Sequence, residues 1–145
     1  MTVLDLAHAD LAGADLSDAC LACAYLYGAC LAGATLRGTI LADACLRSVN
    51  LTDADLTGAD LTGAALRGAS LTDATLRGAR LTDADLTDAN LAGSDLRGAD
   101  LRGALLADAN LTGARRDPSD PAIPGWAVVA GRLARDSSPQ GPSLA

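Results

Sequence analysis

Three short segments carry residue types that could perform chemistry. Two cysteines lie in CLAC, residues 20–23, but a zinc ribbon needs a second such pair, and redox use needs a helix N-terminus that stabilises the thiolate. The segment DADLTD, residues 83–88, begins like a calcium loop and lacks the glycine and closing glutamate of that loop. His8 is the only histidine, and no nucleophile is implied beside it. We therefore predict no metal site, no cofactor and no enzymatic activity.

The composition indicates what kind of scaffold must position these residues. Half of the 145 residues are hydrophobic, almost all of them leucine and alanine, and lysine, glutamate and phenylalanine are absent. A globular core is packed with varied large side chains, so this composition indicates a repeat. Residues 1–114 hold 15 aspartates and 7 arginines, a net charge of −8. Such acidity argues against direct binding to nucleic acid.

Targeting signals are not evident in the sequence. No basic segment followed by an apolar run opens the chain, and no apolar stretch approaches the thickness of a bilayer. We expect a cytoplasmic protein that does not associate with membranes. Its four cysteines are then expected to be reduced.

Leucine recurs at every fifth position from Leu6 to Leu111, 22 times without an exception. Five residues advance an α-helix by about 140°, so leucines on a helix would share no face. In a flat strand an odd period places them alternately on both faces. Because neither element buries the row, the chain must turn within each unit of five.

Two further positions of each unit explain how the chain turns. The residue two before the leucine is alanine in 18 of the 22 units, and both side chains lie on the same side of an extended segment. The residue two after the leucine is glycine 12 times and aspartate 7 times, types that tolerate positive φ at a corner. Each unit is therefore one short side and one corner, and four corners close a square. Stacked squares form a solenoid of about five and a half coils, spaced ~4.8 Å apart.

The segment ADLTGADLTGAALRGASLTDATLRGA, residues 54–79, resembles the A(D/N)LxX repeat of the pentapeptide-repeat family. The resemblance covers residues 4–113. It implies an all-β fold, the right-handed quadrilateral β-helix, and the handedness follows from the resemblance alone. Some members that protect against gyrase-directed antibiotics resemble a DNA duplex in size and charge, and they bind topoisomerase in its place.

Three regions are expected along the chain: the β-helix over 1–114, a capping segment over 115–135 and a disordered tail over 136–145. Arg116 occupies a leucine slot, and the three prolines that follow it cannot continue the ladder. The segment GWAVVAGRLA, residues 125–134, alternates like a short strand or hairpin.

The capping segment should fold back over the last coil, because an exposed coil end invites association. We predict that Trp126, together with Val128 or Val129, forms this cover. The residues expected beneath it are Leu105, Leu106 and Leu111. Residues 1–4 offer little covering at the other end, so a homodimer could form through the coil ends.

Outward side chains twenty residues apart should stack on one face of the square. The least polar group gathers around one corner near the N-terminal end: Cys20, Cys23, Tyr25, Tyr27, Ile40 and Cys45. Exposed tyrosine and isoleucine beside small apolar residues favour a protein-interaction patch. Scattered outward residues without any role would give the same pattern.

A second group of outward residues is acidic. Its members are Asp15, Asp55, Asp60, Asp95 and Asp100. An acidic row could mimic the phosphates of a DNA duplex, but Arg37, Arg77 and Arg97 interrupt it and indicate a self-neutralising surface.

Two functions remain open from the sequence. The lack of chemistry and the apolar patch favour a rigid, non-enzymatic scaffold that binds another protein. The alternative is a DNA-mimicking modulator or protector of DNA gyrase or topoisomerase, in antibiotic resistance or self-immunity, which the acidity of the repeats favours. Both readings predict a protein partner, and the sequence does not name it.

Overall fold

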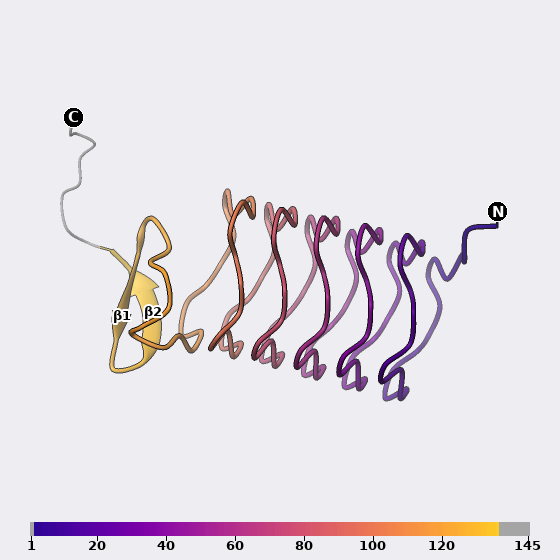
Figure 1. The fold of residues 1–145 in the computed structure, drawn as a ribbon, viewed down its shortest axis with the longest axis horizontal. Helices are drawn as coiled ribbons and strands as arrows, with labels where there is room; N and C mark the ends of the chain where they lie inside the picture. The colour runs from indigo at the N-terminus through magenta and orange to yellow at the C-terminus, as the bar shows by residue number, and fades with distance from the viewer. Residues whose placement is uncertain (1, 137–145) are drawn as a thin grey trace.

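The computed structural model describes residues 2–136, which form a rod of stacked coils with a small cap at one end (Figure 1). This range contains no helix, and so none that could cross a membrane. Its two strands, β1 (Trp126–Val129) and β2 (Arg132–Arg135), both belong to the cap. The tail predicted over 136–145 lies outside the described residues, except for Asp136.

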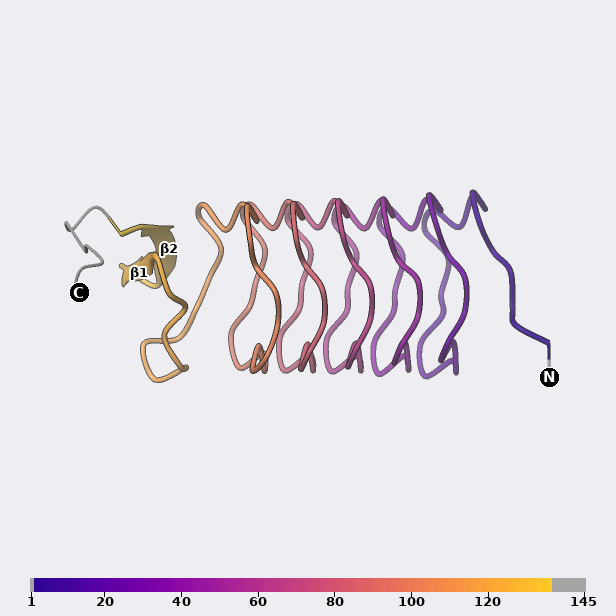
Figure 2. The ribbon, with the colours of Figure 1, turned by 90° about the horizontal axis from the view of Figure 1, so that it is seen from above.

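Each coil takes twenty residues. Parallel bridges join the residue before each leucine to the one twenty positions later, from the pair Asp5–Tyr25 to the pair Asp95–Arg115. Around the first bridge, the Leu6 N–H donates to the Tyr25 carbonyl at 2.7 Å. The Tyr25 N–H in turn donates back to the Leu4 carbonyl at 2.8 Å. The same pattern repeats along the rod, so that successive coils lie parallel (Figure 2).

Every corner is a four-residue turn closed by one backbone hydrogen bond. At the first corner the Ala9 N–H donates to the Leu6 carbonyl at 3.0 Å. The residue two after each leucine has φ between 57° and 74°, as at Asp43 and Gly103. A type II turn requires positive φ at its third residue, and glycine and aspartate adopt it at low cost. The corner prediction is confirmed.

The leucines and the small residues before them fill the tube. Every leucine of the series from Leu26 to Leu96 is fully buried. Thr39 replaces one alanine and donates its hydroxyl to the Leu16 carbonyl at 2.8 Å. At the two ends the leucines are only partly buried: Leu6, Leu11, Leu16, Leu101 and Leu106. The core is therefore complete in the middle of the rod and more open at each end.

The cap takes the place of a further coil along one side. Strands β1 and β2 form an antiparallel hairpin, and Arg132 of β2 bridges Arg115 of the last coil. The Gly113 N–H donates to the Leu133 carbonyl at 2.8 Å, and the Leu133 N–H donates to the Ala114 carbonyl at 2.7 Å. The hairpin predicted for residues 125–134 is confirmed.

The buried side of the cap differs in part from the prediction. Trp126 is buried, as expected, together with Ile123 and Leu133, which the sequence did not single out. Leu111 of the last coil is buried as well. Leu133 is 2% exposed, and its backbone pairs with Gly113 and Ala114 of the last coil.

The prediction that Leu105 lies beneath the cap is wrong. Leu105 is 56% exposed because it occupies the outward slot before Leu106, which is itself only partly buried. Val128 and Val129 are also exposed, at 38% and 62%. The hairpin therefore covers the last coil with β2 and Trp126, and its valines face solvent.

Candidate functional site

Six outward residues come together on two adjacent sides of the rod, around one corner. We call them the tyrosine patch: Cys20, Cys23, Tyr25, Tyr27, Ile40 and Cys45. Cys20 is bridged to Ile40, and Tyr25 is bridged to Cys45. Tyr25, Tyr27 and Ile40 are 43%, 39% and 41% exposed. The structure thus gathers the residues that the twenty-residue spacing placed together.

Ring contacts order the aromatic part of the patch. The rings of Tyr25 and Tyr27 are stacked, with 6.4 Å between centroids and 14° between planes. The His8 ring meets Tyr27 edge-on at 5.5 Å. His8 also covers Gly28, where a Cβ would lie 2.7 Å from Nδ1 of His8. The sequence analysis missed His8 as part of this surface, although a spacing of twenty residues joins it to Gly28.

Two arginines continue the column of Tyr27 along the rod. The Gly28 N–H donates to the Arg47 carbonyl, and the Ser48 N–H donates to the Arg67 carbonyl, each at 3.0 Å. Tyr27, Arg47 and Arg67 therefore stand on three consecutive coils, and all are exposed. Sequence reasoning missed both arginines as site residues, although the same spacing would have found them.

The five aspartates predicted to form an acidic face lie on two different sides of the rod. Asp15, Asp55 and Asp95 belong to one ladder, whereas Asp60 and Asp100 belong to the next. These two sides are adjacent, and both also carry arginines, with Arg97 beside Asp95 and Arg80 between Asp60 and Asp100.

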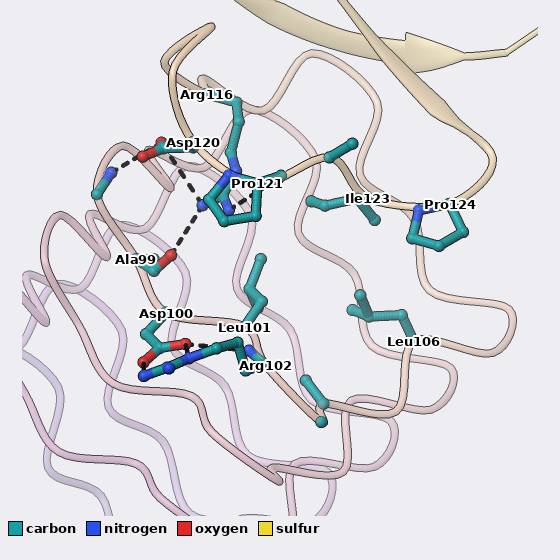
Figure 3. A pocket seen from close by; sticks show the side chains of 14 residues that line it. Ala99, Asp100, Leu101, Arg102, Leu106, Arg116, Asp120, Pro121, Ile123 and Pro124 are labelled. Carbon is teal, nitrogen blue, oxygen red and sulfur yellow. Dashed lines mark hydrogen bonds and ion pairs between the residues drawn. The ribbon is translucent and has the colours of Figure 1, made fainter.

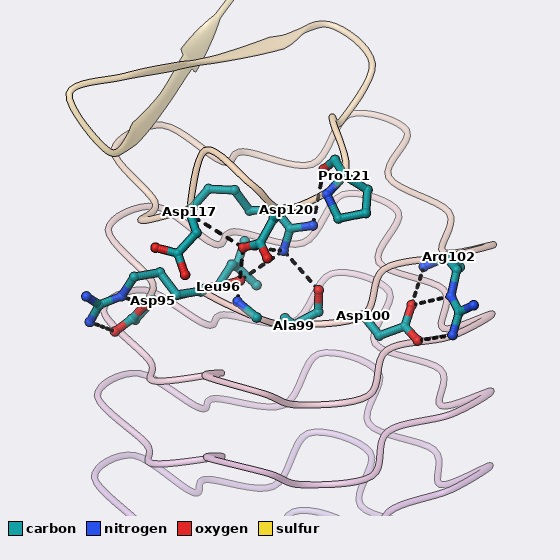
Figure 4. Close-up of polar contacts among 11 residues, drawn as sticks. Asp95, Leu96, Ala99, Asp100, Arg102, Asp117, Asp120 and Pro121 are labelled. Atoms are coloured by element: carbon teal, nitrogen blue, oxygen red, sulfur yellow. Dashed lines mark hydrogen bonds and ion pairs between the residues drawn. The ribbon is translucent and has the colours of Figure 1, made fainter.

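Arginines neutralise part of this group. Arg97 holds Asp95 through two hydrogen bonds of 2.8 and 2.6 Å (Figure 4). Arg102 holds Asp100 in the same way, at 2.9 and 2.6 Å, and lowers the pKa of that carboxyl strongly. Arg37 lies 3.5 Å from Asp55. A mimic of duplex phosphates needs free charge, which these pairs reduce.

Other carboxylates directly before a leucine accept hydrogen bonds from the turn that follows. Asp60 accepts hydrogen bonds from the Thr62 hydroxyl at 2.6 Å and the Thr62 N–H at 3.0 Å, and Thr87 donates to Asp85 in the same way. These bonds favour the charged form, and so they lower the pKa of Asp60 and of Asp85 below the ordinary value. The Asp-Leu-Thr pattern is therefore explained by turn formation.

Removing these hydroxyls should make the rod less sensitive to acid. A carboxyl whose pKa is lowered on folding contributes stability that is present above the unfolded pKa, near 3.9, and is lost as the pH falls through the folded pKa. We expect Thr62→Ala with Thr87→Ala to raise the pKa of Asp60 and Asp85, measured by NMR titration of the carboxyl carbons. Thr52→Ala is the control, because the Thr52 hydroxyl contacts Ser70 and no carboxylate. Unchanged titration in the double variant would contradict this assignment.

Arg116 stands in a leucine slot at the capped end, and it stays inside the rod. Its side chain is 2% exposed, and Nη1 donates to the carbonyls of Leu96 and Ala99, both at 2.9 Å (Figure 4). Nη2 donates to the Pro121 carbonyl at 3.2 Å, and Asp120 lies 3.7 Å away. Burial lowers the pKa of Arg116, and the carboxylate of Asp120 opposes that shift. The guanidinium thus replaces a missing coil along this side.

A cavity of about 540 Å³ lies beside Arg116, between the last coil and the loop that follows (Figure 3). Apolar residues form most of its wall: Leu101, Ala104, Leu106, Pro121, Ile123 and Pro124. The pair Asp100–Arg102 also lines it. This wall brings together no nucleophile and base, so the cavity could hold an apolar group but offers no catalytic arrangement.

Comparison with known proteins decides the family. The family model described as Pentapeptide repeats (8 copies) matches residues 4–38, 19–58, 44–83 and 84–115. The chain belongs to the pentapeptide-repeat family. Its fold is the right-handed quadrilateral β-helix that the resemblance implied.

Several solved pentapeptide-repeat structures are similar to this one. A pentapeptide repeat protein from the thylakoid lumen of Arabidopsis thaliana is 32% identical, with a TM-score of 0.50 over 79% of this chain and 69% of that one. HetL of Nostoc, a protein involved in the regulation of heterocyst differentiation, is 28% identical, with a TM-score of 0.34 over 81% and 78%. The fluoroquinolone resistance protein QnrB1 is 20% identical, with a TM-score of 0.36 over 82% and 72%. Comparison with curated proteins gives no match.

The cysteines of this pentapeptide-repeat chain are all unpaired. Cys20 and Cys23 are exposed, and Cys30 and Cys45 are half-buried. Cys30 lies on another side of the rod, in the ladder of Asp10 and Asn50. Within residues 2–136, no three histidine, cysteine or aspartate side chains gather as metal ligands.

The last coil of the pentapeptide-repeat helix has an open edge next to the cavity. In the coil before it, the Leu81 N–H donates to the backbone carbonyl of Asp100 at 2.8 Å, and the Asp83 N–H donates to the backbone carbonyl of Arg102 at 3.0 Å. Among the described residues, the equivalent N–H groups of the last coil have no acceptor: Leu101, Gly103, Leu106, Asp108 and Leu111. The cap therefore replaces the next coil only in part.

This open edge predicts different hydrogen-exchange rates for amides within one molecule. We expect the amide hydrogens of Leu101 and Gly103 to exchange with solvent at least about a hundredfold faster than those of Leu81 and Asp83, because only the latter are hydrogen-bonded. Hydrogen exchange followed by NMR measures all four together. Equal protection would show that this edge is covered in solution.

Proposed function

We propose that this pentapeptide-repeat chain is a non-enzymatic rod that binds another protein through the tyrosine patch. The observation that carries the proposal is the stacked, exposed pair of Tyr25 and Tyr27 beside exposed Ile40. Aromatic residues are enriched in the cores of protein interfaces, where they supply much of the contact area. We further propose that the protein is cytoplasmic, a proposal that the unpaired cysteines support because thiols stay reduced there.

The ladder supports this proposal because it holds the patch before a partner arrives. Tyr25 is bonded to the first coil through its own N–H and its carbonyl, at 2.8 and 2.7 Å. The Leu26 N–H beside it donates to the Cys45 carbonyl of the next coil at 2.8 Å. Binding to a surface that is already ordered loses little conformational entropy, so more of the contact energy appears as affinity.

A charge placed in the patch tests the proposal. We expect Tyr25→Asp with Tyr27→Asp to abolish the recovery of partner proteins from the protein's own cytosol, measured by quantitative mass spectrometry after affinity purification. Thr52→Asp with Thr72→Asp is the matched control, because these outward threonines lie on another side of the rod. The proposal would be wrong if both variants lost the same partners, or if neither variant lost any.

The acidity of the repeats favours a second candidate, the DNA-mimicking modulator of DNA gyrase. Its support is the net charge of −8 over residues 1–114 on a rod-shaped β-helix. The evidence against it is that Arg80 stands between Asp60 and Asp100, and that arginines form ion pairs with Asp95 and Asp100. We therefore rank it below the scaffold.

A supercoiling assay separates the two candidates. We expect the protein at micromolar concentration neither to inhibit supercoiling by DNA gyrase nor to relieve a gyrase poison. The control is the same assay with the variant Arg97→Gln and Arg102→Gln, which frees two carboxylates that are paired in the native chain. Inhibition by the native protein would reverse our ranking.

A further inference from the structure

The column that runs from Tyr27 along the rod carries two arginines that form no ion pair with a described residue of this chain. Arg47 and Arg67 follow Tyr27 on the next two coils, and both are exposed. The neighbouring outward slots on the same side hold Tyr25, Cys45 and Ala65, so no carboxylate side chain stands there. On a chain of net charge −7, this side combines two cations with an aromatic surface.

No described carboxylate pairs directly with these two arginines. Among the described residues, no ion pair within 4.0 Å involves Arg47 or Arg67, whereas Arg97 and Arg102 each hold an aspartate at 2.6 Å. Asp85 is the nearest acidic residue of the same ladder beyond Ala65. Its charge interacts with both arginines at longer range, but its carboxylate forms no ion pair with either and accepts hydrogen bonds from the hydroxyl and N–H of Thr87. The guanidinium groups of Arg47 and Arg67 are therefore free to form ion pairs with the carboxylates of a partner.

We propose that the partner segment is an acidic peptide that lies along the rod axis, with an apolar residue on the tyrosine patch and carboxylates on Arg47 and Arg67. This inference rests on the proposed function and adds the chemistry and direction of the partner. The complementarity is local: the arginines attract carboxylates, and the rings of Tyr25 and Tyr27 cover an apolar side chain.

The spacing suits an extended segment. Successive coils are ~4.8 Å apart, so the distance from the coil of Tyr27 to the coil of Arg67 is about 10 Å. An extended chain covers that distance in about three residues, because each residue rises ~3.3 Å. Carboxylates at alternate positions lie roughly 6.6 Å apart on one face of such a chain, within reach of two flexible arginine side chains.

A phage-displayed library of random short peptides provides the probe. The library is selected on the native chain and depleted on the variant Tyr25→Asp with Tyr27→Asp. We expect the selected peptides to contain more aspartate and glutamate than lysine and arginine, with an aromatic or aliphatic residue before the acidic positions. Their binding should weaken as ionic strength rises, because exposed charges are screened.

Charge reversal then tests the arginines directly. We expect Arg47→Glu with Arg67→Glu to weaken binding of the selected peptides by about tenfold or more, since two exposed attractions become repulsions. The matched control is Arg37→Glu with Arg77→Glu, which changes the charge equally in the same slot of another side. The control should leave the affinity unchanged.

The outcomes separate this inference from the proposed function. The selected peptides could require Tyr25 and Tyr27 and still bind the Arg47 and Arg67 variant equally well. That result would support the docking surface and contradict the acidic character of its partner. Failure to select any peptide that depends on the tyrosines would overturn both. A mixed-sequence single-stranded oligonucleotide provides the last outcome. If it binds this side more tightly than the selected peptides do, and the Arg47 and Arg67 variant loses that binding, the partner is a nucleic acid and the peptide proposal is wrong.

Discussion

Replacing Leu61 with alanine is expected to lower the free energy of unfolding by about 3 kcal/mol, which is within the range for buried leucines in rigid cores. Leu61 is fully buried in the middle of the rod. Its coil cannot collapse around the lost volume, because the ladder holds it on both sides. The Leu61 N–H donates to the Arg80 carbonyl at 2.7 Å, and the Asp60 N–H donates to the Thr39 carbonyl at 3.0 Å. Urea denaturation followed by circular dichroism measures the change.

Leu11→Ala is the matched control at the N-terminal end. Leu11 occupies the same slot of the repeat and is only partly buried, so we expect a loss of about 1 kcal/mol or less. In a repeat protein, a terminal unit contacts one neighbour instead of two, and its removal frays the end without opening the centre. Equal losses at Leu11 and Leu61 would contradict a core that is complete in the middle and open at its ends.

The repeat region could be predicted from the sequence because one local rule builds it. A leucine, a small residue two before it and a corner residue two after it define each side, and each requirement has a single structural reason. Even the exceptions obey the rule. Thr39 fits the small slot because its hydroxyl finds the Leu16 carbonyl, and His8 and Cys23 take the positive φ of the corner.

The cap could be predicted only as a hairpin. The alternation of residues 125–134 indicates strands, but it does not say which strand meets the coil. The structure places Leu133 of β2 inside and leaves Val128 exposed. The prediction for Leu105 was wrong because two leucines are adjacent at this point. Only the register of the five-residue repeat shows that Leu106 points inward and Leu105 outward.

Surface grouping followed from the twenty-residue spacing, but charge pairing did not. The spacing brings Tyr25 and Ile40 to neighbouring sides of one corner, as predicted. It does not say that Arg97 turns toward Asp95, since that depends on side-chain rotamers and not on register. The same arithmetic leads from Tyr27 to Arg47, so that column was available to the sequence analysis and was overlooked.

Arg116→Leu is expected to loosen the cap, with a loss of about 3 to 5 kcal/mol, the usual cost of removing one partner from a buried charged network. Leucine would restore the volume and the register of the repeat, so any loss must come from the polar contacts. The Ala99 carbonyl would lose its side-chain donor, the Leu96 carbonyl would keep only the Ala99 N–H, and Asp120 would lose its buried cation. Sequence reasoning placed the end of the coil at Arg116 and could not foresee this network, because Asp120 and Pro121 come from an irregular loop.

Trp126 reports the state of the cap. It is the only tryptophan of the chain and is a buried residue of the hairpin, so loosening should shift its fluorescence emission toward longer wavelengths at denaturant concentrations that leave the coils folded. Arg132→Ala is the control: this exposed arginine also donates to a carbonyl, that of Gly113, at 2.8 Å, and its loss should cost about 1 kcal/mol or less. If Arg116→Leu behaves like Arg132→Ala, the cap is held by Trp126 and Leu133 alone. Arg116 would then contribute little to the stability of the cap, and its guanidinium would not be the contact that ends the β-helix.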